Sequence, residues 1–351
     1  MELESRIRNY MSDPSADDFN DLALEAFAYQ YESIPPYREL CRKRGIEPGS
    51  VLDWSAIPAV PALAFKSLDL SSAPAREIFV SSGTTGTSPS RHLQPFPELY
   101  RAAIDASFPG ACLQPVGTEK PPILALIPDR EQAPSSSLSF MAEHVIERFG
   151  APSSTFAFGP HGVEAAAARS WLGARQREGR PVLVMATAFA LAQLFDALSR
   201  FGLRFRLPAG SVVFETGGFK GRTRELDRDE MRARLAELLD LSPSAVVSEY
   251  GMTELSSQFY TRLGGEGPSG VFFAPHWTRV RVLDPGTLDE VAGGEAGIIA
   301  ILDLANLGSA VHLLTEDLGA TEGDGFRLVG RASGAELRGC SLAVEELMER
   351  S

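Results

Sequence analysis

Hydrophobic positions divide the chain into a helical start, a long stretch of alternating strands and helices, and a final part without long helices. Near the start, six apolar residues share one face of a predicted helix that Pro35-Pro36 ends: Phe19, Leu22, Ala23, Ala26, Phe27 and Tyr31. Five short runs rich in Val, Ile and Phe follow, at 78–80, 123–127, 182–185, 212–214 and 245–247. Helical patterns lie between several of these runs, at 140–149, 189–201 and 224–239. This alternation predicts a doubly wound α/β sheet that is buried on both faces.

The pattern changes at a glycine-rich loop over residues 264–270. The sequence after it alternates without long helices, which predicts a smaller β-rich subdomain. At ~150 residues per domain, a chain of this length suggests about two domains. We expect an α/β core with an N-terminal helical segment over 1–263, a β-rich subdomain of the same body over 264–330, and a short tail over 331–351.

Charge and composition exclude several classes of protein. The 33 basic and 46 acidic residues give a net charge of −13, which makes nucleic acid an unsuitable partner. The first 17 residues hold no apolar segment of the kind that a signal peptide needs, so a cytoplasmic location is expected. The longest apolar stretch, 182–192, is too short for a membrane span. Three distant cysteines favour neither a disulfide framework nor a zinc cluster.

Candidate chemistry follows three of the predicted strands, where ligands collect in open α/β sheets. After the first strand, residues 81–91 combine glycines, hydroxyls and Arg91, which together suit a phosphate, although a flexible Ser/Gly loop explains the composition equally well. Another strand end, 215–221, has paired glycines and Lys220, where a bland turn is the simpler interpretation. A third, 248–254, brings together an aromatic ring, a hydroxyl and a carboxylate.

Four ordered motifs together resemble those of the adenylate-forming superfamily, which includes acyl-CoA synthetases, adenylation domains and luciferases. They are Ser82-Gly83-Thr84-Thr85-Gly86, Tyr250-Gly251-Met252-Thr253-Glu254, Leu314-Thr315-Glu316-Asp317 and Gly330-Arg331. Within it, residues 18–347 look like the LuxE-type acyl-protein synthetases, also called long-chain-fatty-acid luciferin-component ligases. The resemblance implies an α/β fold like the N-terminal domain of adenylate-forming enzymes, with doubly wound sheets, a smaller β-rich subdomain and a largely absent C-terminal lid.

The same resemblance implies roles for individual residues with ATP and Mg²⁺. The phosphate loop would comprise Ser81, Ser82, Gly83, Thr84, Thr85 and Gly86, with Arg91 as its cation. Tyr250 would stack on adenine, in a nucleotide pocket lined by Gly217, Gly218 and Gly251. The catalytic Thr253 would bind the α-phosphate and Glu254 would hold Mg²⁺. Asp317 would bind the ribose hydroxyls, and Arg331 the ribose or a phosphate.

Departures from the superfamily pattern direct attention to Lys66. Only 20 residues follow Arg331, none of them lysine, whereas other members carry a lid with a catalytic lysine there. Glu316 also stands where glycine is common. The chain has four lysines, and Lys66 lies in a stretch that matches the family, so we expect it to reach the ATP phosphates, with Lys220 as the second candidate. An ordinary surface lysine is the alternative.

Cys340 matches the acyl-accepting cysteine that acyl-protein synthetases carry near the C-terminus. Its thiolate would attack the acyl-adenylate, form a thioester and release AMP. The alternative is a small packing residue. The resemblance thus implies an ATP-dependent ligase that activates a carboxylic acid, in this family a fatty acid, and passes the acyl group through Cys340 to a partner such as an acyl reductase. Transfer to an external acceptor (coenzyme A, a carrier-protein thiol or an amine) and a non-catalytic nucleotide-binding subunit remain the alternatives.

Overall fold

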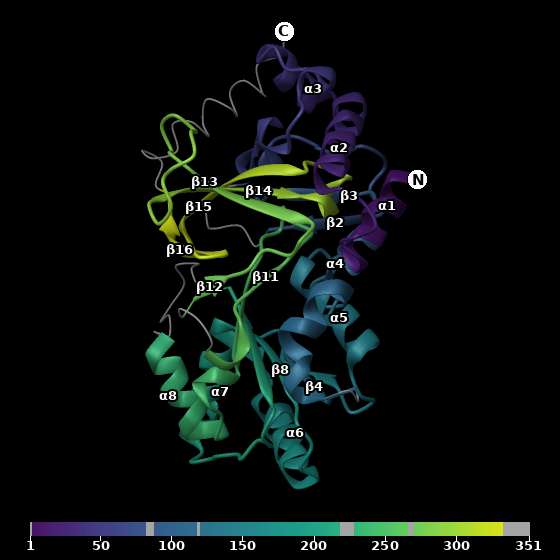
Figure 1. The fold of residues 1–351 in the computed structure, drawn as a ribbon. Coiled ribbons are helices and arrows are strands. Elements are labelled where there is room, and N and C mark those ends of the chain that lie inside the picture. The colour runs from purple at the N-terminus through teal and green to yellow at the C-terminus, as the bar shows by residue number, and fades with distance from the viewer. Residues whose placement is uncertain (1, 82–87, 118–119, 218–227, 266–269, 333–351) are drawn as a thin grey trace. The chain divides into compact units, whose positions relative to one another are not determined.

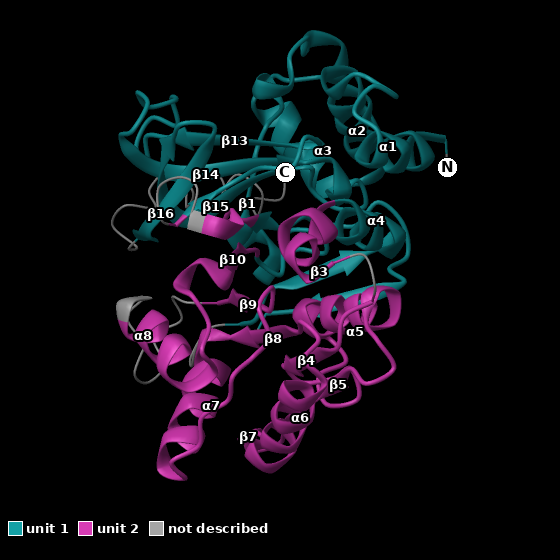
Figure 2. Ribbon diagram, turned by 60° about the horizontal axis from the view of Figure 1, so that its bottom comes forward, with its two compact units in different colours: residues 1–106, 252–259, 271–351 teal, residues 107–251, 260–270 magenta. Residues whose placement is uncertain are grey.

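A computed structural model describes residues 2–81, 88–117, 120–217, 228–265 and 270–332 (Figure 1). The chain divides into two compact units (Figure 2). Unit 1 takes its described residues from 1–106, 252–259 and 271–351, and unit 2 from 107–251 and 260–270. Unit 1 thus joins residues from both ends of the chain. The division into 1–263, 264–330 and 331–351 stays a prediction.

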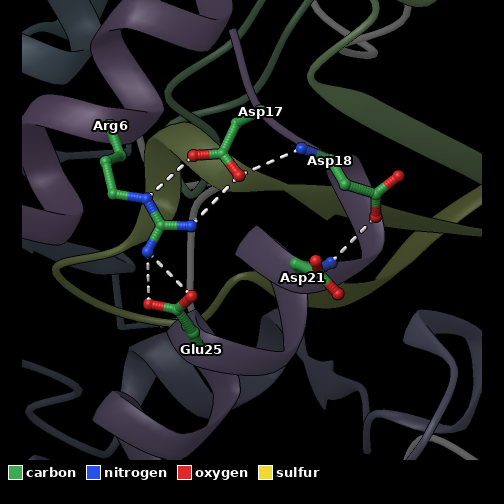
Figure 3. Close-up of polar contacts among 5 residues, drawn as sticks. All are labelled: Arg6, Asp17, Asp18, Asp21 and Glu25. Carbon is green, nitrogen blue, oxygen red and sulfur yellow. Dashed lines mark hydrogen bonds and ion pairs between the residues drawn. The ribbon is translucent and has the colours of Figure 1, made fainter.

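The N-terminal pattern forms helix α2 (Phe19–Ser33) in unit 1, as predicted. The carboxylate of Asp18 caps this helix by accepting a hydrogen bond from the main-chain N–H of Asp21. Pro35-Pro36 begins helix α3 (Pro35–Lys43), since proline fits the first turn of a helix. The sequence did not predict helix α1 (Glu2–Ser12), which precedes them. Arg6 of α1 forms ion pairs with Asp17 at 2.8 Å and with Glu25 of α2 at 2.7 Å (Figure 3), and these contacts join α1 to α2.

Unit 2 is built on a sheet in the order β11-β10-β9-β8-β4-β5, in which β10, β9, β8, β4 and β5 are parallel. Its strands are β4 (Ile123–Leu126), β5 (Thr155–Phe156), β8 (Leu183–Thr187), β9 (Val212–Thr216), β10 (Val246–Tyr250) and β11 (Phe259–Tyr260). Strands β4, β5, β8, β9 and β10 are parallel to their neighbours among these five. Four of the five apolar runs are thereby confirmed as strands of one sheet.

Helices cover both faces of this sheet. They are α5 (Ser137–Phe149), α6 (Ala165–Glu178), α7 (Ala188–Arg200) and α8 (Arg228–Leu239). Val213 of β9 packs in a core shared by α6, α7 and α8. The next residue, Phe214, faces the other way and packs against Phe108, the last residue of α4 (Pro97–Phe108), which also stacks on Phe149. The predicted burial of both faces is confirmed.

One sequence expectation needs correction. The run at 78–80 does form a strand, β2 (Glu77–Val80), but it pairs antiparallel with β3 (Arg91–Gln94) in unit 1 and takes no part in the parallel sheet. A parallel partner requires a long crossover, whereas only ten residues separate these two strands. The segment after α4 begins with one π-helical turn (Pro109–Leu113), in which Cys112 is completely buried.

Unit 1 holds an antiparallel sheet in the order β12-β16-β15-β14-β13. Its strands are β12 (Val271–Phe272), β13 (Thr278–Leu283), β14 (Ala296–Asp303), β15 (His312–Glu322) and β16 (Gly325–Arg331). The short strand β1 (Val60–Pro61) joins it by pairing parallel to β15. A small hairpin, β6 (Phe158–Gly159) and β7 (Gly162–Val163), belongs to unit 2. Among the described residues, no helix is both long enough and apolar enough to cross a bilayer.

Candidate active site

In unit 2, the carboxyl ends of three parallel strands bring polar residues to one edge of the sheet. Thr187 of β8 is paired with Thr216 of β9, which is paired with Glu249 of β10. Tyr250 ends β10 and is largely buried, at 7% exposure. Gly217 follows β9 with φ of 80°, a conformation that favours glycine, and no described atom lies within 4 Å of where its Cβ would be. Tyr250 and Gly217 therefore lie at the edge where such sheets bind ligands.

Glu249, to which the motifs assign no role, has an unusual environment at this edge. The Thr216 hydroxyl donates a hydrogen bond to its carboxylate. Burial raises the pKa of Glu249 to about 7, and the nearby Glu215 carboxylate adds to the rise. A Cβ at position 251 would overlap the Glu249 carboxylate, so the glycine of the Tyr250-Gly251 motif leaves room for this side chain in its present position.

In unit 1, a histidine and an asparagine hold the Thr253-Glu254 segment through its main chain. The carbonyl of Thr253 lies 2.8 Å from His92 Nδ1, which must carry the proton because a carbonyl only accepts. The other ring nitrogen then accepts from the Ser309 hydroxyl at 2.7 Å. The Asn306 amide donates to the Glu254 carbonyl at 2.9 Å. Burial lowers the pKa of His92 to about 4, so the ring is neutral at neutral pH.

A buried carboxylate fixes the residues that follow. Asp303 accepts hydrogen bonds from the main-chain N–H groups of Ser256 and Ser257, and from the Ser257 hydroxyl at 2.7 Å. Burial raises the pKa of Asp303 to about 6, although these hydrogen bonds oppose the rise. The Glu254 side chain itself is 7% exposed. Hydrogen bonds thus hold the main chain at Thr253 and Glu254, and just after them, in place.

The strand pairing of unit 1 brings Lys66 to the motif around Asp317. Because β1 pairs with β15 in the register Pro61↔Leu314, the following 3₁₀ turn (Ala62–Lys66) reaches the middle of β15. Lys66 Nζ lies 4.0 Å from Glu316 Oε2, and Arg331 Nη2 lies 2.7 Å from the same oxygen. Asp317 is paired with Arg331 across β15 and β16.

The base of the predicted phosphate loop is closed by two hydrogen bonds between Ser81 and Ser90, at 3.0 and 2.9 Å. Arg91 pairs with the exposed carboxylate of Asp69 at 3.1 Å. The other residues predicted for the site fall outside the described residues: Ser82, Gly83, Thr84, Thr85, Gly86, Gly218, Lys220 and Cys340. Their roles stay predictions.

Comparison with known proteins identifies the family. The family model of the LuxE acyl-protein synthetases matches residues 164–349, more than half of the chain. The chain belongs to this family. A long-chain-fatty-acid–luciferin-component ligase from Vibrio harveyi is 25% identical over 338 residues, which cover 93% of this chain and 86% of that protein. The ligase of the same name from Aliivibrio fischeri is 20% identical and covers 94% and 88%.

Solved structures show the fold. A crystal structure of 2-hydroxyisobutyryl-CoA ligase, in an open conformation with 2-HIB-AMP and CoA, has a TM-score of 0.63 at 16% identity, over 89% of this chain and 74% of that one. The predicted α/β adenylate-forming fold is therefore confirmed. The chain is therefore an acyl-protein synthetase of the LuxE family with the fold of adenylate-forming ligases.

Proposed function

We propose that this LuxE-family protein activates a long-chain fatty acid with ATP and Mg²⁺ and passes the acyl group through its own Cys340 to a partner protein. The acid is suggested by the names of the Vibrio harveyi and Aliivibrio fischeri relatives. The observation that carries the proposal is the meeting of Lys66 and Arg331 at Glu316, next to Asp317. This arrangement puts cations beside the carboxylate expected to bind ribose.

The first step joins two anions, which explains the need for cations. A carboxylate oxygen of the acid attacks the α-phosphorus of ATP, an acyl–phosphate bond forms, and pyrophosphate leaves as the bond to the β-phosphate breaks. Lys66 and Arg331 offset the repulsion, Thr253 donates a hydrogen bond to the α-phosphate, and Asp317 accepts from the ribose hydroxyls. Tyr250 stacks on adenine.

Glu254 is the residue proposed to hold Mg²⁺. The ion commonly binds through one or two protein carboxylates together with phosphate oxygens and water, so a single buried carboxylate suits it. When bound, Mg²⁺ supplies positive charge to the phosphates. The hydrogen bond from Asn306 to the Glu254 carbonyl fixes the main chain that carries this carboxylate.

The second step moves the acyl group to Cys340. Its thiolate attacks the acyl carbonyl, a thioester forms, and the bond to AMP breaks. The other two cysteines suit this task poorly. Both are fully buried, and burial raises the pKa of Cys41 to about 12 and that of Cys112 well above its usual range. We propose an acyl reductase as the partner that takes the acyl group from the thioester, and a cytoplasmic location for the reaction.

Exchange of labelled pyrophosphate into ATP tests the activation step. A screen of fatty, aryl and amino acids should give exchange with long-chain fatty acids, and hydroxylamine should trap the acyl-adenylate as a hydroxamate. Asp317→Asn should lower exchange strongly, while Asp324→Asn, an exposed carboxylate at the turn between β15 and β16, should leave it unchanged. No exchange with any acid would contradict the proposal, and exchange only with aryl or amino acids would contradict the fatty-acid substrate.

A further inference from the structure

Glu316 lies between two cations that come from distant parts of the sequence. Its Oε2 is 2.7 Å from Arg331 Nη2 and 4.0 Å from Lys66 Nζ. Its main-chain carbonyl accepts a hydrogen bond from the N–H of Ala332 at 2.9 Å, so the residue after β16 is also tied to this point. The Glu316 side chain is 17% exposed, less than either cation.

A second pair on the same two strands shows what an ordinary ion pair looks like here. Glu322 of β15 pairs with Arg327 of β16 at 3.3 Å, and its side chain is 36% exposed. That pair involves one cation, lies near the turn between the strands, and resembles the surface ion pairs that contribute little to stability. Glu316 differs because it is less exposed and has a second cation, Lys66, as a partner.

The charges of Lys66, Arg331 and Glu316 indicate what the Glu316 carboxylate does. Lys66 and Arg331 approach one oxygen, so without the carboxylate their like charges would repel and the two flexible side chains would turn toward solvent. With it, both cations stay beside Asp317, and their two positive charges balance those of the Glu316 and Asp317 carboxylates. Arg331 makes the shorter contact, while Lys66, at 4.0 Å, is the cation more easily drawn onto a phosphate.

We propose that Glu316 is a positioning residue for nucleotide binding, which holds Lys66 and Arg331 together where the ATP phosphates and ribose arrive. This inference rests on the proposed function, and it explains why a carboxylate stands where superfamily members commonly have glycine. Glu316 touches no reacting atom and acts through the two cations.

Pyrophosphate exchange with a long-chain fatty acid, measured over a range of ATP concentrations, tests the role of Glu316. Glu316→Gln should raise the KM for ATP about tenfold, in line with the loss of a charge-assisted contact, and should change kcat much less. Glu322→Gln, the matched control on the same strands, should leave both constants unchanged. Lys66→Met should also raise the KM for ATP. In the double variant Lys66→Met/Glu316→Gln, the KM should exceed that of Lys66→Met only by the part of the Glu316 effect that acts through Arg331. The combined rise in KM should therefore be far below the product of the two single rises.

The outcomes separate this inference from the proposed function. An unchanged or lower KM for ATP in Glu316→Gln, with normal exchange by the unaltered protein, would overturn the positioning role alone. Glu316→Asp keeps the charge and should retain most of the ATP affinity, and a loss equal to that of the Gln variant would also overturn it. Failure of the unaltered protein to exchange would instead contradict the proposed function.

Discussion

Replacing His92 with asparagine will change how the stability of unit 1 depends on pH. The buried ring donates to the Thr253 carbonyl and accepts from Ser309, and burial lowers its pKa from 6.5 to about 4. Below about pH 6.5 the His92 ring binds a proton in the unfolded chain but stays neutral in the folded protein. The free energy of unfolding therefore falls as the pH falls toward about 4. By proton linkage, the loss from this ring reaches about 2 kcal/mol at about pH 5.

Asparagine keeps an N–H group for Thr253 but leaves Ser309 without its ring partner. His92→Asn should therefore be less stable than the unaltered protein by about 1–3 kcal/mol at about pH 7. The asparagine does not titrate, so this gap should shrink by about 2 kcal/mol at about pH 5. Other titrating groups, including Asp303, Glu249 and His312, are present in both proteins and cancel in the comparison.

Urea unfolding followed by tryptophan fluorescence measures this gap. In a Trp171→Phe background, the two remaining tryptophans, Trp54 and Trp277, both lie in unit 1 and report on it alone. A stability gap that is the same at both pH values, or that widens on acidification, would refute the account of His92 as a ring held neutral by burial.

Further substitutions test the site and the sheet of unit 1. Lys66→Ala should lower the rate of pyrophosphate exchange about ten- to a hundredfold, whereas the control Lys43→Ala on helix α3 should leave the rate unchanged. Full exchange by Lys66→Ala would exclude a role for Lys66 at the ATP phosphates. Gly297→Ala would place a Cβ against a main-chain carbonyl of β13, and thermal unfolding should show a loss of stability of about 1–3 kcal/mol. Gly293→Ala is the control, because its Cβ would meet only one distant atom, and it should keep the stability of the unaltered protein. Asp303→Asn would put an amide where backbone N–H groups need an acceptor, and should lower both stability and exchange; normal exchange would show that this anchor is not needed.

The strands of unit 2 could be predicted from the sequence because they are buried on both faces. Such strands give continuous apolar runs, as at 123–127 and 182–185, and these became β4 and β8. A helix with a narrow buried stripe, such as α1, is harder to predict. In α1 only Ile7, Tyr10 and Met11 are buried, and this i, i+3, i+4 spacing was the one signal that could have found it.

The neighbourhood of Lys66 could not be predicted in the same way. Its position depends on β1, a strand of two residues that pairs with β15 about 250 residues later in the chain. So short a strand leaves no periodic pattern, and the pairing follows from tertiary packing. Resemblance and the scarcity of lysines point to Lys66, but no pattern in the sequence predicts its contact with Glu316 or the hydrogen bond from His92 to Thr253.

The mass of the intact protein, measured after incubation with ATP, Mg²⁺ and a long-chain fatty acid, tests most directly whether the acyl group passes through Cys340. We expect an adduct equal to the acid minus water, removed by neutral hydroxylamine and mapped to Cys340. Cys340→Ser should keep pyrophosphate exchange but carry no adduct, while Cys112→Ala should still carry it. An acyl-adenylate that forms without any adduct on the protein, or an adduct that persists in Cys340→Ser, would contradict the thioester step.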